Sequence, residues 1–104
     1  MYKITFYVPE SHKEKVKDAV FSAGAGRVGH YDSCSFEVLG LGQFRPLAGS
    51  KPFVGKIGVL ERITEYKVEM IVADKNMKAA VKALKEAHPY ESPSYDVFKL
   101  EIVG

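Results

Sequence analysis

The sequence has little of several things that mark special classes of protein. It has one cysteine, Cys34, so no disulfide can form within the chain, and a reducing compartment, the cytoplasm, is expected. The net charge is only +2, and the lysines are spread over two predicted helices, which argues against a nucleic-acid partner. No apolar run is long enough to span a bilayer, and the first residues alternate like a strand rather than resembling a signal peptide. No membrane partner is expected.

Glycine is scarce outside one segment. The chain has 9 glycines, and all but Gly104 fall between residues 24 and 58. Glycine is unfavourable inside helices and strands, so this density indicates turns, left-handed backbone or close approach of the backbone to another group. The segment 24–58 is therefore the candidate functional surface, and the remainder is predicted to be its scaffold.

The scaffold is predicted from its hydrophobic periodicity as a single domain over residues 1–104. Alternation over 2–8 predicts a strand, and a Ser11–Glu14 capping box with a stripe at i, i+3, i+4 and i+7 predicts a helix that stops at Gly24. Further strands are expected over 34–39, 57–73 and 95–103, with a loop over 40–55. A second helix should begin at Asp74 and end before Pro89.

This β-α-β-β-α-β order predicts an α+β, ferredoxin-like fold, with a four-stranded antiparallel sheet and two helices on one face. The last strand is expected to turn Phe98, Leu100 and Ile102 toward the core. The face without helices is expected to carry Thr5, Tyr7, Lys67, Glu69, Ile71, Val97 and Val103. Because that face is apolar and aromatic, self-association through it or through the strand edges is expected.

Residues 24–29, GAGRVG, match the letters of a GxGxxG dinucleotide motif. That motif needs a strand before it and a helix after it, so that phosphate meets a helix N-terminus. Here a helix precedes and a strand follows, and a helix stop with a flexible turn is the better interpretation.

His30, Asp32 and Cys34 alternate at a spacing of two, so they share one face if the segment is extended. Imidazole, carboxylate and thiolate together suit a zinc-like ion, with further ligands from elsewhere. The alternative is that Cys34 is a small buried apolar residue and the segment is a loop.

His88, Tyr90 and Glu91 form a second cluster, around Pro89 in the turn before the last strand. A histidine there can simply cap the helix, yet such a turn can also hold a ligand. The long loop with Phe44, Arg45 and Phe53 can grip a partner or an anion, or dock on its own domain. A nucleophilic Cys34 is a weaker alternative, because no third group or oxyanion hole is evident.

The sequence resembles the domain inserted into bacterial Nif-three-like proteins (relatives of the NGG-one-interacting factor). The resemblance covers residues 24–100 and rests on four stretches: GAGRVGHYDSCSF, GLGQFRPLAGSKPFVGKIG, ERITEYKVEMIV and HPYESPSYDVFKL. The positions that match are Cys34, Phe44, Pro52, Gly55, Glu69, His88, Pro89, Tyr90 and Glu91, whereas His30 and Ser33 depart from the pattern. The resemblance implies a fold akin to the trimeric CutA and PII proteins. It also implies that the two-metal site of full-length relatives lies in other domains.

These observations favour a small oligomeric sensing or regulatory module of the PII or CutA kind, a trimer, binding a divalent metal ion or a small anion in a cleft. The alternatives are an oligomerisation or protein-interaction domain without ligand and, more weakly, a metal-dependent hydrolase; catalysis is not expected. The predicted ligand-binding residues are Phe44, Arg45, Glu69, His88, Tyr90 and Glu91. The predicted ligands of a zinc-like ion are His30, Cys34, His88 and Glu91.

Overall fold

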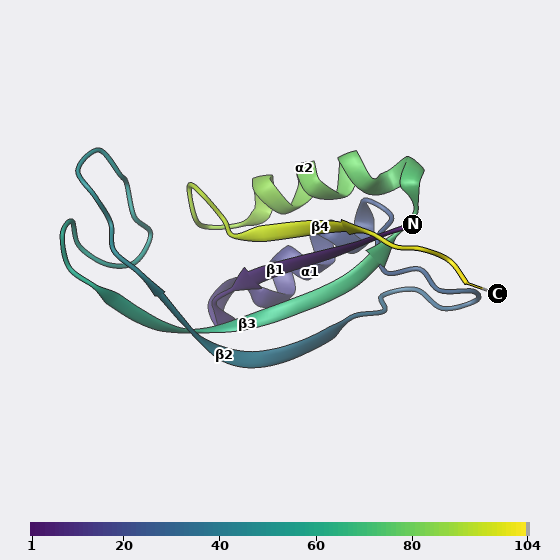
Figure 1. Ribbon diagram of the computed structural model, residues 1–104, viewed down its shortest axis with the longest axis horizontal. Coiled ribbons are helices and arrows are strands. Elements are labelled where there is room, and N and C mark those ends of the chain that lie inside the picture. Colours follow the sequence, from purple (N-terminus) through teal and green to yellow (C-terminus); the bar gives the residue numbers. More distant parts are fainter. Residues whose placement is uncertain (104) are drawn as a thin grey trace.

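The computed structural model describes residues 1–103. It shows a four-stranded antiparallel sheet with two helices packed on one face, which confirms the predicted fold class (Figure 1). The sheet order is β2-β3-β1-β4. The strands are β1 (Tyr2–Val8), β2 (Phe36–Phe44), β3 (Glu61–Val72) and β4 (Tyr95–Lys99), and the helices are α1 (Lys13–Ser22) and α2 (Met77–Ala87).

The core lies between the helices and the two central strands. Alternate residues of β1 and β3 face the helices, while α1 and α2 each present a stripe of buried residues spaced by four. The buried apolar residues are Ile4, Phe6, Val8, Val16, Val20, Ala25, Val68, Met70, Val72, Ala80 and Leu84. These are the faces that the periodicity of β1, β3 and both helices predicts.

The helix starts differ from the prediction. A 3-10 turn comes before each helix, Glu10–His12 before α1 and Asp74–Asn76 before α2, and no side chain caps either helix start. Asp74 instead pairs with the amino group of Met1. The capping-box interpretation of Ser11 and Glu14 was therefore wrong: Ser11 lies inside the 3-10 turn, where its hydroxyl contacts the His12 ring.

The stop of α1 at Gly24 is confirmed. Gly24 has a φ of 109°, and its N–H donates to the carbonyl of Phe21, while the N–H of Ala25 donates to that of Val20. This pair of bonds is the Schellman motif, which satisfies the last carbonyls of a helix. The GxGxxG letters thus describe a helix end, and Val28 and Tyr31 form a short β-bridge after it.

The second strand is longer than predicted, and the third is shorter. β2 continues through Gly40 and Gly42 to Phe44, so residues 40–44 are strand and not loop, and β3 begins at Glu61 rather than at 57. A side chain at Gly42 would overlap the Glu65 carboxylate of the paired strand. Gly42 therefore leaves space for a neighbouring side chain, and neither glycine of β2 breaks the strand.

The predicted core face of the last strand was wrong. Tyr95 pairs with Phe6 and Val97 pairs with Ile4, so Tyr95 and Val97 point to the core. Phe98 and Ile102 are 54% and 74% exposed. Apolar residues occur at both odd and even positions of this strand, so the alternation alone did not show which set faces the core. A shift of one residue moves every side chain to the other face of the sheet. The strand also ends at Lys99 and not at 103.

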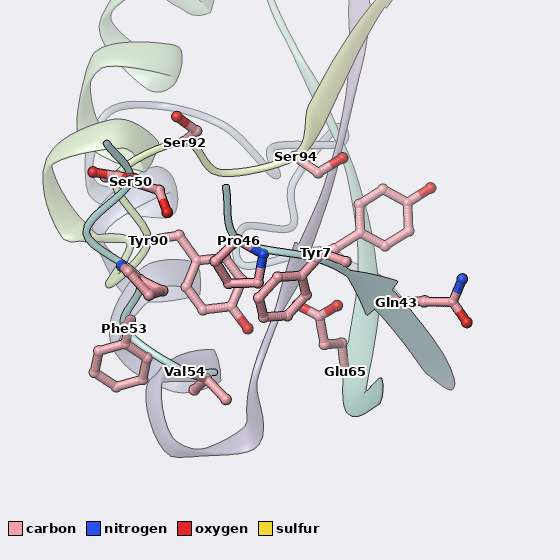
Figure 2. A pocket seen from close by; sticks show the side chains of 13 residues that line it. Tyr7, Gln43, Pro46, Ser50, Phe53, Val54, Glu65, Tyr90, Ser92 and Ser94 are labelled. Atoms are coloured by element: carbon pink, nitrogen blue, oxygen red, sulfur yellow. The ribbon is translucent and has the colours of Figure 1, made fainter. Parts of the chain in front are cut away.

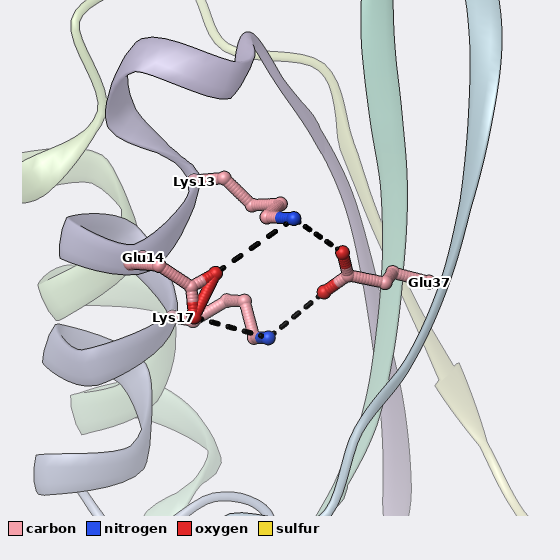
Figure 3. Close-up of polar contacts among 4 residues, drawn as sticks. All are labelled: Lys13, Glu14, Lys17 and Glu37. Atoms are coloured by element: carbon pink, nitrogen blue, oxygen red, sulfur yellow. Dashed lines mark hydrogen bonds and ion pairs between the residues drawn. The ribbon is translucent and has the colours of Figure 1, made fainter.

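An ion cluster joins α1 to the edge strand β2. Glu37 accepts hydrogen bonds from Lys13 (2.6 Å) and Lys17 (2.8 Å), and Glu14 lies beside both lysines (Figure 3). The hydrogen bonds from Lys13 and then Lys17 are the main causes that lower the pKa of Glu37. The cluster ties the helix layer to a strand that has a neighbour on one side only.

Within residues 1–103, none of the helices combines the length and the apolar character needed to cross a membrane.

Candidate functional site

A cavity of about 250 Å³ lies at the end of the sheet where β1 ends. Its wall comes from the end of β1, the β2–β3 hairpin, the long loop 45–60 and the segment 90–94, which all gather at the left of Figure 1. Figure 2 shows the side chains that line it. The lining residues are Tyr7, Gln43, Phe44, Pro46, Ser50, Pro52, Phe53, Val54, Glu65, Tyr90, Glu91, Ser92 and Ser94.

His88 fixes the segment that carries Tyr90 and Glu91. Its side chain is buried, with Nε2 2.7 Å from the carbonyl oxygen of Tyr7, and its Nδ1 accepts a hydrogen bond from the Tyr90 N–H at 3.1 Å. A ring that donates from Nε2 and accepts at Nδ1 is the neutral Nε2–H tautomer. Burial is the main cause that lowers the pKa of His88, against the opposing effect of the Tyr7 hydrogen bond. Both ring nitrogens are engaged within the chain, so His88 positions the site rather than offering a free ligand atom.

Aromatic rings form one wall. The Tyr90 ring lies 6.4 Å from Phe44 and 6.1 Å from Phe53 between centroids, and 4.8 Å from the imidazole of His88. Phe53 also makes an edge contact with His12, at 5.3 Å. The long loop is thereby docked on the domain through Phe53, and Phe44 supports it from the end of β2.

Two carboxylates reach the cavity. Glu91 accepts a hydrogen bond from the backbone N–H of Lys51 at 2.9 Å, which ties the long loop to the turn after α2. Glu65 lies across Gly42 of the paired strand. These contacts bring together residues 51 and 91, and residues 42 and 65, around one space.

The Tyr90 hydroxyl is buried beside Glu65. No residue in the described part of the chain gives it a hydrogen-bond partner of acceptable geometry. Burial, then the negative charge of Glu65, and then the approach of its carboxylate to the phenol O–H raise the pKa of Tyr90, so Glu65 is the nearest acceptor for this hydroxyl although the contact falls outside hydrogen-bond geometry. A buried hydroxyl without a partner has an unfavourable free energy, which a ligand able to bond to it would relieve.

The structure separates the residues that the sequence assigned to one site. Phe44, Tyr90 and Glu91 line the cavity, and His88 lies directly behind them. Arg45 is exposed and does not line it. Glu69 lies on the sheet face away from the helices, where it pairs with Lys3 and Lys67, each at 3.4 Å.

The segment 29–34, which carries His30, Asp32 and Cys34, lies at the opposite end of the molecule, near the C-terminus in Figure 1. The Cys34 N–H donates to the Gly26 carbonyl, and the Gly26 N–H donates to the Ile71 carbonyl near the end of β3. The segment is a turn, with positive φ at Gly29 (56°) and Ser33 (55°), so the extended geometry required for a shared face is not formed. The Cys34 thiol contacts the carbonyl of Asp32. One copy of the chain therefore does not bring His30 and Cys34 close to His88 and Glu91. Among residues 1–103 there is no group of three or more His, Cys, Asp or Glu side chains placed to hold a metal ion.

Sequence reasoning missed Tyr7 and Glu65. Both lie on the sheet face away from the helices, and periodicity alone assigns that face to solvent or to self-association. One signal was present. Gly40 and Gly42 are spaced by two on either side of Leu41, and glycines so placed in a strand indicate that another group lies close on one face.

No family model matches the chain. It is 42% identical over 104 residues to the "GTP cyclohydrolase 1 type 2 homolog" of Halalkalibacterium halodurans and 46% identical over 98 residues to the Mycobacterium leprae protein of the same name. These alignments cover 100% and 94% of this chain, but 28% and 26% of the relatives. The chain thus spans about a quarter of the length of the curated relatives that it matches.

Solved structures agree with this match. A Bacillus cereus protein related to NIF3 superposes with a TM-score of 0.83 at 38% identity, over 97% of this chain and 26% of that one. CutA of Pyrococcus horikoshii superposes with a TM-score of 0.72 at 15% identity, over 100% of this chain and 88% of that one, a likeness of fold. The chain therefore corresponds to one domain of the NIF3-related proteins, built on the fold of CutA.

Proposed function

We propose that this chain is a self-associating regulatory module of a NIF3-related protein, and that it binds a small molecule in the cavity beside Tyr90. The observation that carries the proposal is the cavity itself. It is largely apolar, has a few convergent polar groups, and is walled by segments distant in sequence. Small-molecule sites in proteins have this character.

The long loop supplies the means of regulation. The Gly58 N–H donates to the Pro46 carbonyl at 2.7 Å, which closes the base of the loop. The tip reaches the domain through Lys51 and Phe53. Because both contacts are at the cavity, a bound ligand would hold the loop against the domain. The loop also has four exposed apolar side chains, which a partner protein could bind: Leu47, Phe53, Ile57 and Val59.

Self-association is supported by the edge strand β2. It has a hydrogen-bonded neighbour on one side only, and it exposes Phe36 (68%), Leu39 (59%) and Leu41 (72%). An unpaired strand with exposed apolar side chains is a template for pairing with another chain. We propose a homo-oligomer joined through β2, with three copies as the favoured number.

Light scattering on Leu41→Asp tests the interface. The unmodified chain is expected to be oligomeric at micromolar concentration and the variant monomeric, because a charge at Leu41 cannot be buried between copies. Leu47→Asp makes the same change at a loop residue that is 67% exposed, and it should leave the oligomer intact. A monomeric unmodified chain would remove the self-association part of the proposal.

The sequence predicted a metal ion or a small anion as the ligand, and this proposal keeps neither as the ligand of the cavity in a single copy of the chain. The lining contains two carboxylates and no lysine or arginine, so it disfavours an anion. A zinc-like ion stays a prediction that would need ligands from more than one copy, since one copy keeps His30 and Cys34 away from His88. Metal analysis of protein purified without a histidine tag tests it.

Ligand binding itself is tested by nuclear magnetic resonance with a library of small organic fragments. Fragments are expected to shift the amide signals around Tyr90 and Ser94. Phe53→Ala removes one aromatic wall and should weaken those fragments, whereas Leu47→Ala changes the same loop outside the cavity and should not. If no fragment shifts these signals, the alternative without a ligand, an oligomerisation or protein-interaction domain, is favoured.

The name "GTP cyclohydrolase 1 type 2 homolog" belongs to relatives about four times as long as this chain. We propose that the chain contributes binding and assembly to such a protein and not its catalytic groups. This agrees with His88, the histidine behind the cavity wall, having both ring nitrogens engaged in holding the fold.

A further inference from the structure

The only charged side chains that line the cavity are negative. Its 13 lining residues include the carboxylates of Glu65 and Glu91 and no lysine, arginine or histidine. The cationic residues of the overlying loop, Arg45, Lys51 and Lys56, are exposed and none of them lines the cavity; Lys51 contributes its backbone N–H to Glu91. A ligand in this space therefore meets negative potential that no lining cation offsets.

Glu65 lines the cavity from β3. Its carboxylate lies over Gly42 of the paired strand, in space that a side chain at position 42 would share. In Figure 2 the hydroxyl end of Tyr90 and the Glu65 carboxylate point into the same part of the cavity. The Tyr90 hydroxyl thus lies beside a carboxylate that can accept its hydrogen, while its oxygen has no hydrogen-bond donor among residues 1–103. A ligand N–H group between them would have two oxygen acceptors.

The aromatic part of the wall can contact an ammonium group or a flat ring. Four aromatic side chains line the space: Tyr7, Phe44, Phe53 and Tyr90. The rings of Phe44 and Phe53 are tilted by 48° and 44° to that of Tyr90, so they form walls and not a closed stack. Aromatic faces attract ammonium groups within roughly 6 Å of the ring centroid.

We propose that this cavity binds a small organic cation, an ammonium attached to a flat or compact apolar group, with its N–H groups directed to Glu65 and to the Tyr90 hydroxyl. The inference rests on the proposed function, because it names the ligand class of that same cavity. The volume of about 250 Å³ suits a ligand near the size of a single substituted ring. Drug-sized ligands occupy pockets of roughly 300–1,000 Å³.

Three probes of matched size and different charge test the proposal: benzylammonium, benzyl alcohol and benzoate. Each is titrated into the full chain at neutral pH, and affinity is read from the amide signals around Tyr90 and Ser94. Benzylammonium is expected to bind about tenfold more tightly than benzyl alcohol, and benzoate is expected to bind most weakly. Added salt should weaken benzylammonium and leave benzyl alcohol unchanged.

Glu65→Gln keeps the shape of the side chain and removes its charge. It should weaken benzylammonium about fivefold and leave benzyl alcohol within about twofold. Tyr90→Phe removes only the hydroxyl, and it should weaken benzylammonium about fivefold, the change expected for one hydrogen bond of average strength. Glu86→Gln makes the matched charge change on the exposed side of α2 and should change none of the three affinities.

The outcomes distinguish failure of the small-molecule site from failure of its preference for cations. If none of the three probes and no member of the fragment library shifts the cavity signals, the proposed function fails, and the ligand class with it. If benzyl alcohol or benzoate binds as tightly as benzylammonium, the small-molecule site stands and the cation inference is overturned. Equal weakening of benzylammonium by Glu65→Gln and Glu86→Gln would also overturn it, because the effect would then be one of net charge.

Discussion

Replacing His88 with alanine should destabilise the whole domain, although the residue follows the last turn of a helix. The side chain joins the turn after α2 to β1, 81 residues away, through the Tyr7 carbonyl. The alanine variant loses this hydrogen bond and the one from the Tyr90 N–H, each about 1 kcal/mol. It also leaves the partly buried Tyr7 carbonyl without this donor and a cavity the size of the ring, so the total loss is about 2–4 kcal/mol.

Thermal unfolding followed by circular dichroism at fixed protein concentration measures this loss. For a domain of this length, 1 kcal/mol corresponds to about 4 °C in Tm, so the expected decrease is about 8–16 °C. His30→Ala makes the same change at an exposed histidine, and it should cost less than about 0.5 kcal/mol. Equal stability of the two variants would show that the imidazole of His88 does not join the two segments.

The lowered pKa of His88 also predicts how the free energy of unfolding changes with pH. Burial lowers the pKa of His88 below its ordinary 6.5, so between the two pKa values the unfolded chain binds more protons than the folded one. The free energy of unfolding should therefore be fully retained above pH 6.5 and should decrease as the pH falls below it. His88→Gln keeps a donor near Tyr7 without titrating, and it should flatten this decrease. An unchanged slope in that variant would refute the assignment to His88.

Two further predictions concern the scaffold. Gly26→Ala should lower the free energy of unfolding by about 2 kcal/mol or more, because Gly26 has a φ of 77° and an added Cβ would lie 2.7 Å from the Phe21 ring. Gly29→Ala is the control: Gly29 also has a positive φ but free space around it, so the loss should be about 1 kcal/mol. Equal losses in the two variants would contradict the overlap with Phe21. Glu37→Gln should cost about 0.5–1 kcal/mol at neutral pH, measured by urea unfolding. The lowered pKa of Glu37 means that this contribution is present above pH 4.5 and is lost as the pH falls through the folded value, so below it the variant and the parent should converge.

The sequence by itself determined the layers of this protein. Alternation in β1 and β3 and the four-residue spacing in α1 and α2 are local patterns, and they gave the element order and most of the core. The stop at Gly24 was equally local, because a glycine after an apolar helical stripe needs no distant partner. Such features are set by residues within one or two turns of each other.

Only the tertiary structure decided the phase of β4 and the length of β2. Apolar residues occur in both phases of residues 95–103, and the pairing of Tyr95 with Phe6 selects one of them. Gly40 and Gly42 are poor strand residues by propensity, yet both lie within β2, and the Glu65 side chain of the paired strand occupies the space beside Gly42. In each case the deciding contact is to a strand distant in sequence.

The candidate site shows the same division. The chemical types of His88, Tyr90 and Glu91 marked their turn as a candidate from the sequence. Tyr7 and Glu65 carried no such mark, and the shared site predicted for Cys34 and His88 is divided between the two ends of the molecule. Local pattern reports which face a side chain occupies in its own element. Which elements meet around a cavity depends on sheet order, strand twist and loop docking, and these are fixed only when the whole chain packs.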